Sequence, residues 1–194
     1  MENRILIIGD ELFGEHGEAA VRCSEMLLCV RPNRPMQFSL NAPCLTSMGQ
    51  LMARASSDII GKRAGRTVFG LGYGEMLIAR GDGRQVAETY GKLVDEILNK
   101  TVSEIHLITV PRDLLPAVPD QVDVLNESIR GFAGMSADRI HVDDFDAHVE
   151  VFKKKQLERG KFARSLFSDD AKPTSLYLTL LSLFMQDCIL KVLK

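Results

Sequence analysis

The sequence predicts an α/β fold, built on a five-stranded parallel sheet with helices on both faces. Five short apolar runs, each bounded by Gly, Pro, Asn or Asp, alternate with segments whose apolar residues recur at helical spacing. Strands that alternate with helices form parallel sheets through right-handed crossovers. We interpret residues 1–194 as a single domain, because the length suits one core and no repeat or linker divides the chain.

The elements follow from these patterns in order. The strands are expected at Arg4–Ile8, Met36–Leu40, Thr67–Leu71, Glu104–Val110 and Arg139–Val142. The helices are expected at Glu18–Leu28, Met48–Lys62, Arg84–Asn99, Gln121–Phe132, Val149–Arg159 and Pro173–Leu193. Pro173 suits the first turn of the last helix, where its missing N–H breaks no bond. Because ligands of parallel α/β sheets bind beyond the carboxyl ends of the strands, we expect the site in the loops that follow them.

Composition and charge exclude several classes of protein. The chain is 45% hydrophobic and 26% charged, with a net charge of -2, so no overall field draws it to nucleic acid or to an anionic membrane. The apolar segment Leu176–Leu193 is interrupted by Gln186, Asp187 and Lys191, which indicates a packed helix. Because the first residues lack the pattern of an export signal, we expect a cytoplasmic protein without a membrane partner.

Four segments of the sequence resemble the conserved blocks of the GDSL/SGNH hydrolases. Ile5–Leu12 resembles the strand followed by Gly-Asp-Ser-Leu, with Glu11 at the serine position. The blocks Asn41–Thr46, Gly72–Glu75 and Asp169–Pro173 follow in the family's order. The resemblance covers nearly the whole chain. It implies a flavodoxin-like three-layer sandwich with the strand order 2-1-3-4-5.

The resemblance also implies that the catalytic positions of this family are changed. The family uses a serine nucleophile, a histidine base, and a glycine and an asparagine that bind the oxyanion. Glu11 stands at the serine position, Thr46 approximately at the glycine, Gly74 at the asparagine and Lys172 at the histidine. Asp169 matches the acid that normally orients the histidine. We therefore expect a degenerate relative, and we assign no catalytic residue.

A binding pocket is expected where the replaced residues meet. We expect Glu11 and Lys172 to form an ion pair; in the alternative, each faces solvent separately. Asp10 is expected to accept hydrogen bonds from the loop backbone. The predicted pocket residues are Asp10, Glu11, Asn41, Thr46, Tyr73, Glu75 and Lys172. No metal-binding spacing supports an ion among the carboxylates, so no metal and no cofactor are expected.

The predicted function is binding of an unidentified small molecule or protein without ester hydrolysis. A first alternative is a hydrolase that reuses the crevice, with Glu11 or Glu75 as general base and Lys172 as an electrostatic clamp. A second is an RNA- or protein-binding module that uses the basic stretch Lys153–Arg164; a degenerate relative, a germ-plasm domain of insects, binds RNA. We favour a solvated helix face for this stretch, and nucleic acid is the less favoured partner.

Overall fold

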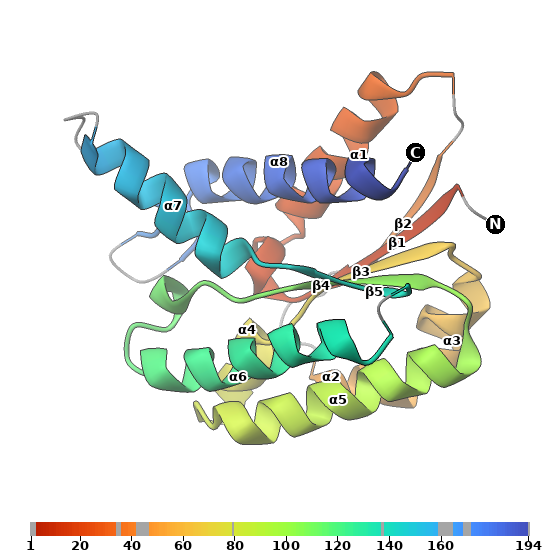
Figure 1. Cartoon of the computed structure of the whole chain (residues 1–194), viewed down its shortest axis with the longest axis horizontal. Helices are drawn as coiled ribbons and strands as arrows, with labels where there is room; N and C mark the ends of the chain where they lie inside the picture. Colours follow the sequence, from red (N-terminus) through yellow and green to blue (C-terminus); the bar gives the residue numbers. More distant parts are fainter. Residues whose placement is uncertain are drawn as a thin grey trace.

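One parallel sheet forms the centre of the protein. The computed structural model describes residues 3–33, 36–41, 47–78, 80–136, 138–158, 165–168 and 172–193. The strands β1 (Arg4–Gly9), β2 (Gln37–Asn41), β3 (Arg66–Gly70), β4 (Glu104–Ile108) and β5 (Ile140–Asp143) pair in the order β2-β1-β3-β4-β5 (Figure 1). All four pairings are parallel. This topology confirms the predicted sheet and places β2 and β5 at its edges.

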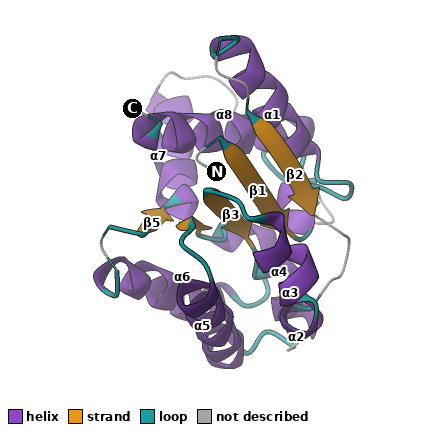
Figure 2. Ribbon diagram, turned by 90° about the vertical axis from the view of Figure 1, so that its right-hand side faces the viewer, coloured by secondary structure: helices purple, strands orange, loops and turns teal. Residues whose placement is uncertain are grey.

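Helices cover both faces of the sheet (Figures 1 and 2). One layer contains α1 (Glu18–Val30), α7 (Phe145–Glu158) and α8 (Ser175–Val192). The other contains α2 (Met48–Ala53), α3 (Ala55–Asp58), α4 (Tyr73–Ile78), α5 (Gly83–Lys100) and α6 (Pro119–Gly131). The strands β1 and β3 are buried along almost their whole length, as their continuous apolar sequences predict.

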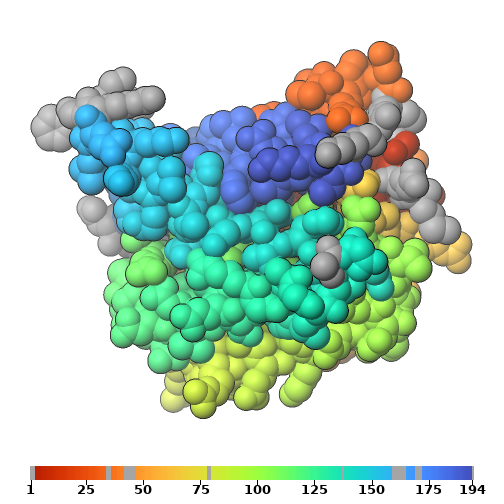
Figure 3. All heavy atoms as spheres, viewed as in Figure 1, coloured from red at the N-terminus to blue at the C-terminus, as the bar shows by residue number. Residues whose placement is uncertain are grey.

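The long apolar helix α8 packs as a core helix. Its residues Tyr177, Leu181, Met185 and Ile189, spaced four apart, are buried on one side of the helix, which lies against α1. By length and composition alone, α8 is the helix in the described ranges that would suffice to cross a membrane. In the space-filling view, the atoms of α8 lie against those of α7 (Figure 3).

The prediction of one continuous helix over Met48–Lys62 is wrong, because the helix is interrupted at two points. The segment forms α2, α3 and a short 3-10 turn at Ile60–Lys62. Inside α3, the Ser57 hydroxyl lies 3.0 Å from the carbonyl of Arg54, the residue at the first break, and 2.9 Å from the Asp58 carboxylate, and its one proton can be donated to either acceptor. Short polar side chains that bond locally compete with helical hydrogen bonds, which explains why apolar spacing alone overestimated this helix.

Two further details differ from the sequence prediction. Pro173 does not lie in the first turn of the last helix; it pairs with Phe167 in an isolated antiparallel bridge. The helix begins at Ser175, where the Thr174 side chain accepts a hydrogen bond from the N–H of Tyr177. The short helix α4 was not predicted, because its sequence follows Gly72 and was interpreted as a loop. Gly72 has φ +129°, a value that favours glycine.

A phenylalanine fits between two glycines where β1 and β3 end. A Cβ atom on Gly9 or on Gly70 would lie 2.2 Å from the ring of Phe13, which is fully buried. We expect Gly70→Ala to lower the free energy of unfolding by roughly 1–3 kcal/mol, because the ring has no space to move into. Gly49→Ala is the matched control, since the nearest atom to its added Cβ is 3.8 Å away. Equal denaturant midpoints for both variants would contradict this packing.

Candidate functional site

Asp10 holds together the two loops that follow β1 and β3. Its Oδ1 accepts a hydrogen bond from the N–H of Leu12 at 2.9 Å, and its Oδ2 accepts from Gly72 at 2.9 Å and Gly74 at 2.8 Å. The side chain is 2% exposed, and burial raises the pKa of Asp10 to about 6 against the lowering effect of these hydrogen bonds. The predicted role of Asp10 in binding the loop backbone is confirmed. Asp10 was also predicted to line the binding pocket, but it is buried among the loop N–H groups that it binds and does not line the surface pocket beside them.

A pocket of about 340 Å³ opens beside these loops. Its charged lining residues are Glu11, Glu15, Glu18 and Lys172. The structure therefore brings Glu11 and Lys172 to one site, although the blocks that carry them are far apart in sequence. The ion pair between these two side chains stays a prediction.

The rest of the pocket lining is largely apolar. Tyr73, Leu77, Pro173 and Leu178 contribute ring and aliphatic surface, and Gly14 completes the lining. These residues come from α4, from the segment before α8 and from α8 itself. The pocket combines charged groups with apolar walls, which is the usual composition of a small-molecule site.

The Glu11 carboxylate lies next to Gly74, at the place where a side chain on residue 74 would begin. A Cβ atom on Gly74 would lie 3.0 Å from Oε2 of Glu11 and 3.5 Å from Oδ2 of Asp10. The glycine at position 74 thus leaves room for the Glu11 carboxylate. An asparagine at this position would have to share the space with Glu11.

The other predicted pocket residues lie elsewhere. The Oε2 of Glu75 accepts a hydrogen bond from the N–H of Met48 at 2.8 Å, at the start of α2. Asn41 is the last residue of β2, opposite Ile8. Neither Glu75 nor Asn41 lines the pocket. Thr46, Asp169 and Asp170 lie outside the described residues.

A partly buried charge network occupies the carboxyl ends of β4 and β5. Arg130 donates to Asp144 at 2.8 and 3.0 Å and to Asp146 at 3.2 Å. Thr109 donates to Asp144 at 3.0 Å and accepts from the N–H of Asp146 at 2.9 Å. Burial alone would raise the pKa of Asp144, but the Arg130 guanidinium lowers it. These groups satisfy one another, so this part of the carboxyl edge is structural.

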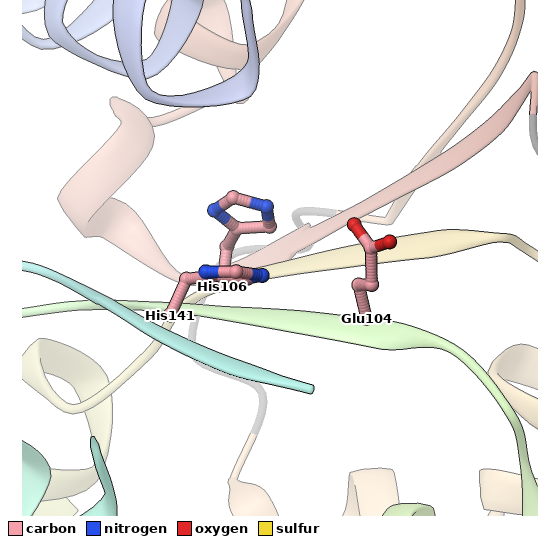
Figure 4. Close-up of side chains that lie close together, drawn as sticks. All are labelled: Glu104, His106 and His141. Atoms are coloured by element: carbon pink, nitrogen blue, oxygen red, sulfur yellow. The ribbon is translucent and has the colours of Figure 1, made fainter. Parts of the chain in front are cut away.

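Sequence analysis missed a cluster formed by Glu104, His106 and His141. One potential ligand atom from each residue lies within 4.8 Å of the others. In the β4–β5 register, His106 pairs with His141, and all three side chains stand on the same side of the strands (Figure 4). The alternation of polar and apolar residues in both strands was the available signal. This alternation alone does not show that His106 and His141 are neighbours, because their contact depends on the register between β4 and β5.

A second cavity lies at the opposite end of the sheet. It measures about 450 Å³ and is lined in part by Thr67, Thr101 and Ser103, at the amino ends of β3 and β4. The hydroxyls of Thr67 and Ser103 are 2.9 Å apart, so these polar groups are paired with each other. No sequence motif was assigned to this end.

The basic stretch on α7 is partly neutralised. Lys153 forms ion pairs with Asp113 and Glu150, both at 2.8 Å. Lys154 and Lys155 are exposed. The remaining basic residues of this stretch, Arg159, Lys161 and Arg164, lie outside the described residues.

The fold and the position of the pocket define the class of protein to which the structure is similar. A five-stranded parallel sheet of this order, flanked by helices, occurs in solved structures of SGNH hydrolases. The structure matches solved lipases and acetylxylan esterases of this kind across nearly the whole chain.

Three solved structures illustrate the similarity. A lipase/acylhydrolase from Enterococcus faecalis matches with a TM-score of 0.75 and 12% identity, over 97% of this chain and 95% of that one. A putative lipolytic protein of the G-D-S-L family from Desulfitobacterium hafniense matches with a TM-score of 0.70 and 14% identity, over 96% and 99%. Axe2, an acetylxylan esterase from Geobacillus stearothermophilus, matches with a TM-score of 0.72 and 14% identity, over 97% of this chain and 93% of that one.

At these identities the similarity establishes the fold alone. No sequence model of a protein family matches the chain. No curated protein matches it by sequence either. The chemistry of the pocket must therefore be argued from the residues of this chain.

Proposed function

We propose that the protein binds a small ligand in the pocket between Glu11 and Lys172 and does not hydrolyse acyl esters. The observation that carries the proposal is that these two residues share one pocket. In the sequence resemblance to GDSL hydrolases, Glu11 stands at the position of the nucleophile and Lys172 at the position of the base. A glutamate that attacked an ester would form an anhydride, and a lysine ammonium is not a base near neutral pH.

A hydrolase that uses Glu11, Glu75 and Lys172 is supported less well. Such a mechanism needs a free carboxylate as general base within hydrogen-bond reach of the substrate. The Glu75 carboxylate accepts the N–H of Met48 and does not line the pocket. Glu75 is therefore not placed to act on a substrate in the pocket, and Glu11 remains as the base of this alternative. Binding without hydrolysis needs no base.

The lining favours a cationic ligand with an apolar body. Three carboxylates, those of Glu11, Glu15 and Glu18, face one lysine, Lys172. A pocket lined mainly by one sign of charge attracts ligands of the opposite sign. The apolar walls would bury the body of the ligand, and the volume suits a small molecule. We therefore propose an organic amine as the class of ligand.

Titrations with benzylamine, benzoate and benzyl alcohol test this proposal. Chemical shifts of backbone amides would be followed in ¹⁵N-labelled protein. We expect benzylamine to bind most tightly and to shift the amides around Glu11 and Tyr73. Glu15→Gln should weaken benzylamine binding by about two- to fivefold, the range of an exposed ion pair. Glu25→Gln, an exposed change elsewhere on α1, should leave it unchanged.

Two outcomes would contradict the proposed ligand class. In the first, benzoate binds more tightly than benzylamine. In the second, the shifts centre on the cavity near Thr67 and Ser103. Ester hydrolysis is measured separately, as described in the Discussion.

A further inference from the structure

Two histidines stack across β4 and β5, beneath α8. The ring centroids of His106 and His141 are 4.8 Å apart, and the planes meet at 27°. Glu104 stands two residues before His106 on the same face of β4 (Figure 4). This cluster is separate from the pocket that Glu11 and Lys172 line.

His106 offers a buried nitrogen that lacks a hydrogen-bond partner. Its Nδ1 lies 2.9 Å from Oδ2 of Asp143, and the residue is 1% exposed. Its Nε2 is buried without a hydrogen-bond partner in the described part of the chain. Such a group costs free energy when it is left unsatisfied. A carboxylate on one ring nitrogen is also the arrangement that orients metal-binding histidines, with the other nitrogen on the metal.

Glu104 also has a supporting partner. Nε of Arg66 lies 2.9 Å from Oε2 of Glu104, and Nη2 of Arg66 donates to Oε1 at 3.5 Å. A glutamate that ligates through one oxygen can keep the other on the arginine, which fixes its orientation. The positive charge of Arg66 disfavours binding of a cation nearby. The two negative charges of Glu104 and Asp143 favour it and exceed the charge of Arg66.

We propose that Glu104, His106 and His141 form a binding site for a divalent transition-metal ion such as Zn²⁺. Two imidazoles and one carboxylate are an established ligand set for Zn²⁺, and also for Fe²⁺. Bonds of about 2 Å would draw the three ligand atoms to roughly 3–4 Å from one another. The half-buried side chains of Glu104 and His141 can close the present separation by rotation. Because β5 is an edge strand, the ion can reach His141 from solvent.

Binding of Zn²⁺ and of Co²⁺ to the metal-free protein tests this site. We expect one equivalent of Zn²⁺ to bind, measured by calorimetry, and the melting temperature to rise with Zn²⁺ concentration. Co²⁺ should give visible absorption of a nitrogen- and oxygen-ligated ion. His141→Gln and Glu104→Gln should each weaken binding by more than about tenfold. Asp143→Asn, which alters the partner of His106, should weaken it by roughly 10–100-fold.

The control is His148→Gln. His148 is an exposed histidine on α7 whose ring stacks on Phe145 and lies tilted against Phe184, and it is not part of the cluster. This variant should bind one equivalent as tightly as the unmodified protein. The proposal is overturned if the unmodified protein binds no Zn²⁺ or if His141→Gln binds it equally well. A thiolate charge-transfer band with Co²⁺ would assign the ion to a cysteine and would overturn it as well.

Discussion

Replacing Asp10 by alanine is expected to destabilise the protein by about 4 kcal/mol near pH 4, because three backbone N–H groups lose their acceptor. The donors are Leu12, Gly72 and Gly74. Each unsatisfied buried donor costs about 1–3 kcal/mol. Since these bonds join the loops after β1 and β3, the variant should also loosen the pocket.

The loss of stability caused by Asp10→Ala should be smaller near neutral pH than near pH 4. Burial raises the pKa of Asp10 from 3.8, the ordinary value of the exposed side chain, to about 6 in the folded protein. Between these values the folded state holds a proton that the unfolded state has released, so stability falls as pH rises through this window. A shift of this size corresponds to about 3 kcal/mol. The unmodified protein already carries this cost above pH 6, which leaves a loss of about 1 kcal/mol for Asp10→Ala.

Denaturant unfolding of the unmodified protein, Asp10→Ala and Asp10→Asn across this pH range measures both effects. The asparagine variant cannot ionise, so the pH-dependent part of its difference from the unmodified protein reports the titration of Asp10. The part that does not vary with pH reports the N–H bonds that the amide nitrogen cannot accept. The exposed Asp95→Ala serves as the matched control and should change stability little. If Asp10→Ala is as stable as Asp95→Ala near pH 4, the assigned role of Asp10 is wrong.

The second large effect concerns ester turnover. The combined change Glu11→Ser, Thr46→Gly, Gly74→Asn and Lys172→His is expected to give measurable hydrolysis of a short-chain acyl ester. Each single change should remain nearly inert. A serine without a base is a weak nucleophile, and the members of a catalytic triad act as a unit. One oxyanion donor alone is worth ~10²–10³ in rate.

In the structure, two of these substitutions are coupled: the effect of Gly74→Asn depends on whether residue 11 is still a glutamate. The Cβ of residue 74 would lie 3.0 Å from Oε2 of Glu11, so Gly74→Asn alone should crowd the carboxylate. With Glu11→Ser, this crowding is removed. We expect Gly74→Asn to destabilise the unmodified protein more than it destabilises the Glu11→Ser variant. Equal losses in both backgrounds, measured by denaturant unfolding, would contradict this coupling.

Most of the fold could be predicted because the central strands β1 and β3 are buried on both faces and have continuous apolar sequences. The run from Ile5 to Ile8 is apolar throughout, and strand boundaries differ from the predicted ones by at most two residues. The helix Met48–Lys62 failed because local hydrogen bonds of Ser57 compete with helical ones. Such competition leaves no trace in apolar spacing.

The site could be predicted only where neighbouring residues and the resemblance placed it. Glu11, Tyr73 and Lys172 line one pocket, and their role in binding a ligand stays a prediction. Glu75 does not line this pocket, because its carboxylate bonds to Met48, 27 residues away in sequence. The stacked pair His106 and His141 depends on the register of two strands, and only the structure provides that register.

Hydrolysis of a short-chain acyl ester by the unmodified protein tests the central claim most directly. The steady-state rate is measured beside that of the Glu11→Gln variant, in which the carboxylate is replaced by an amide of the same shape. We expect the two rates to be equal and not to saturate with substrate. Saturable turnover that disappears in Glu11→Gln would show that the glutamate is catalytic and would contradict the proposed binding function.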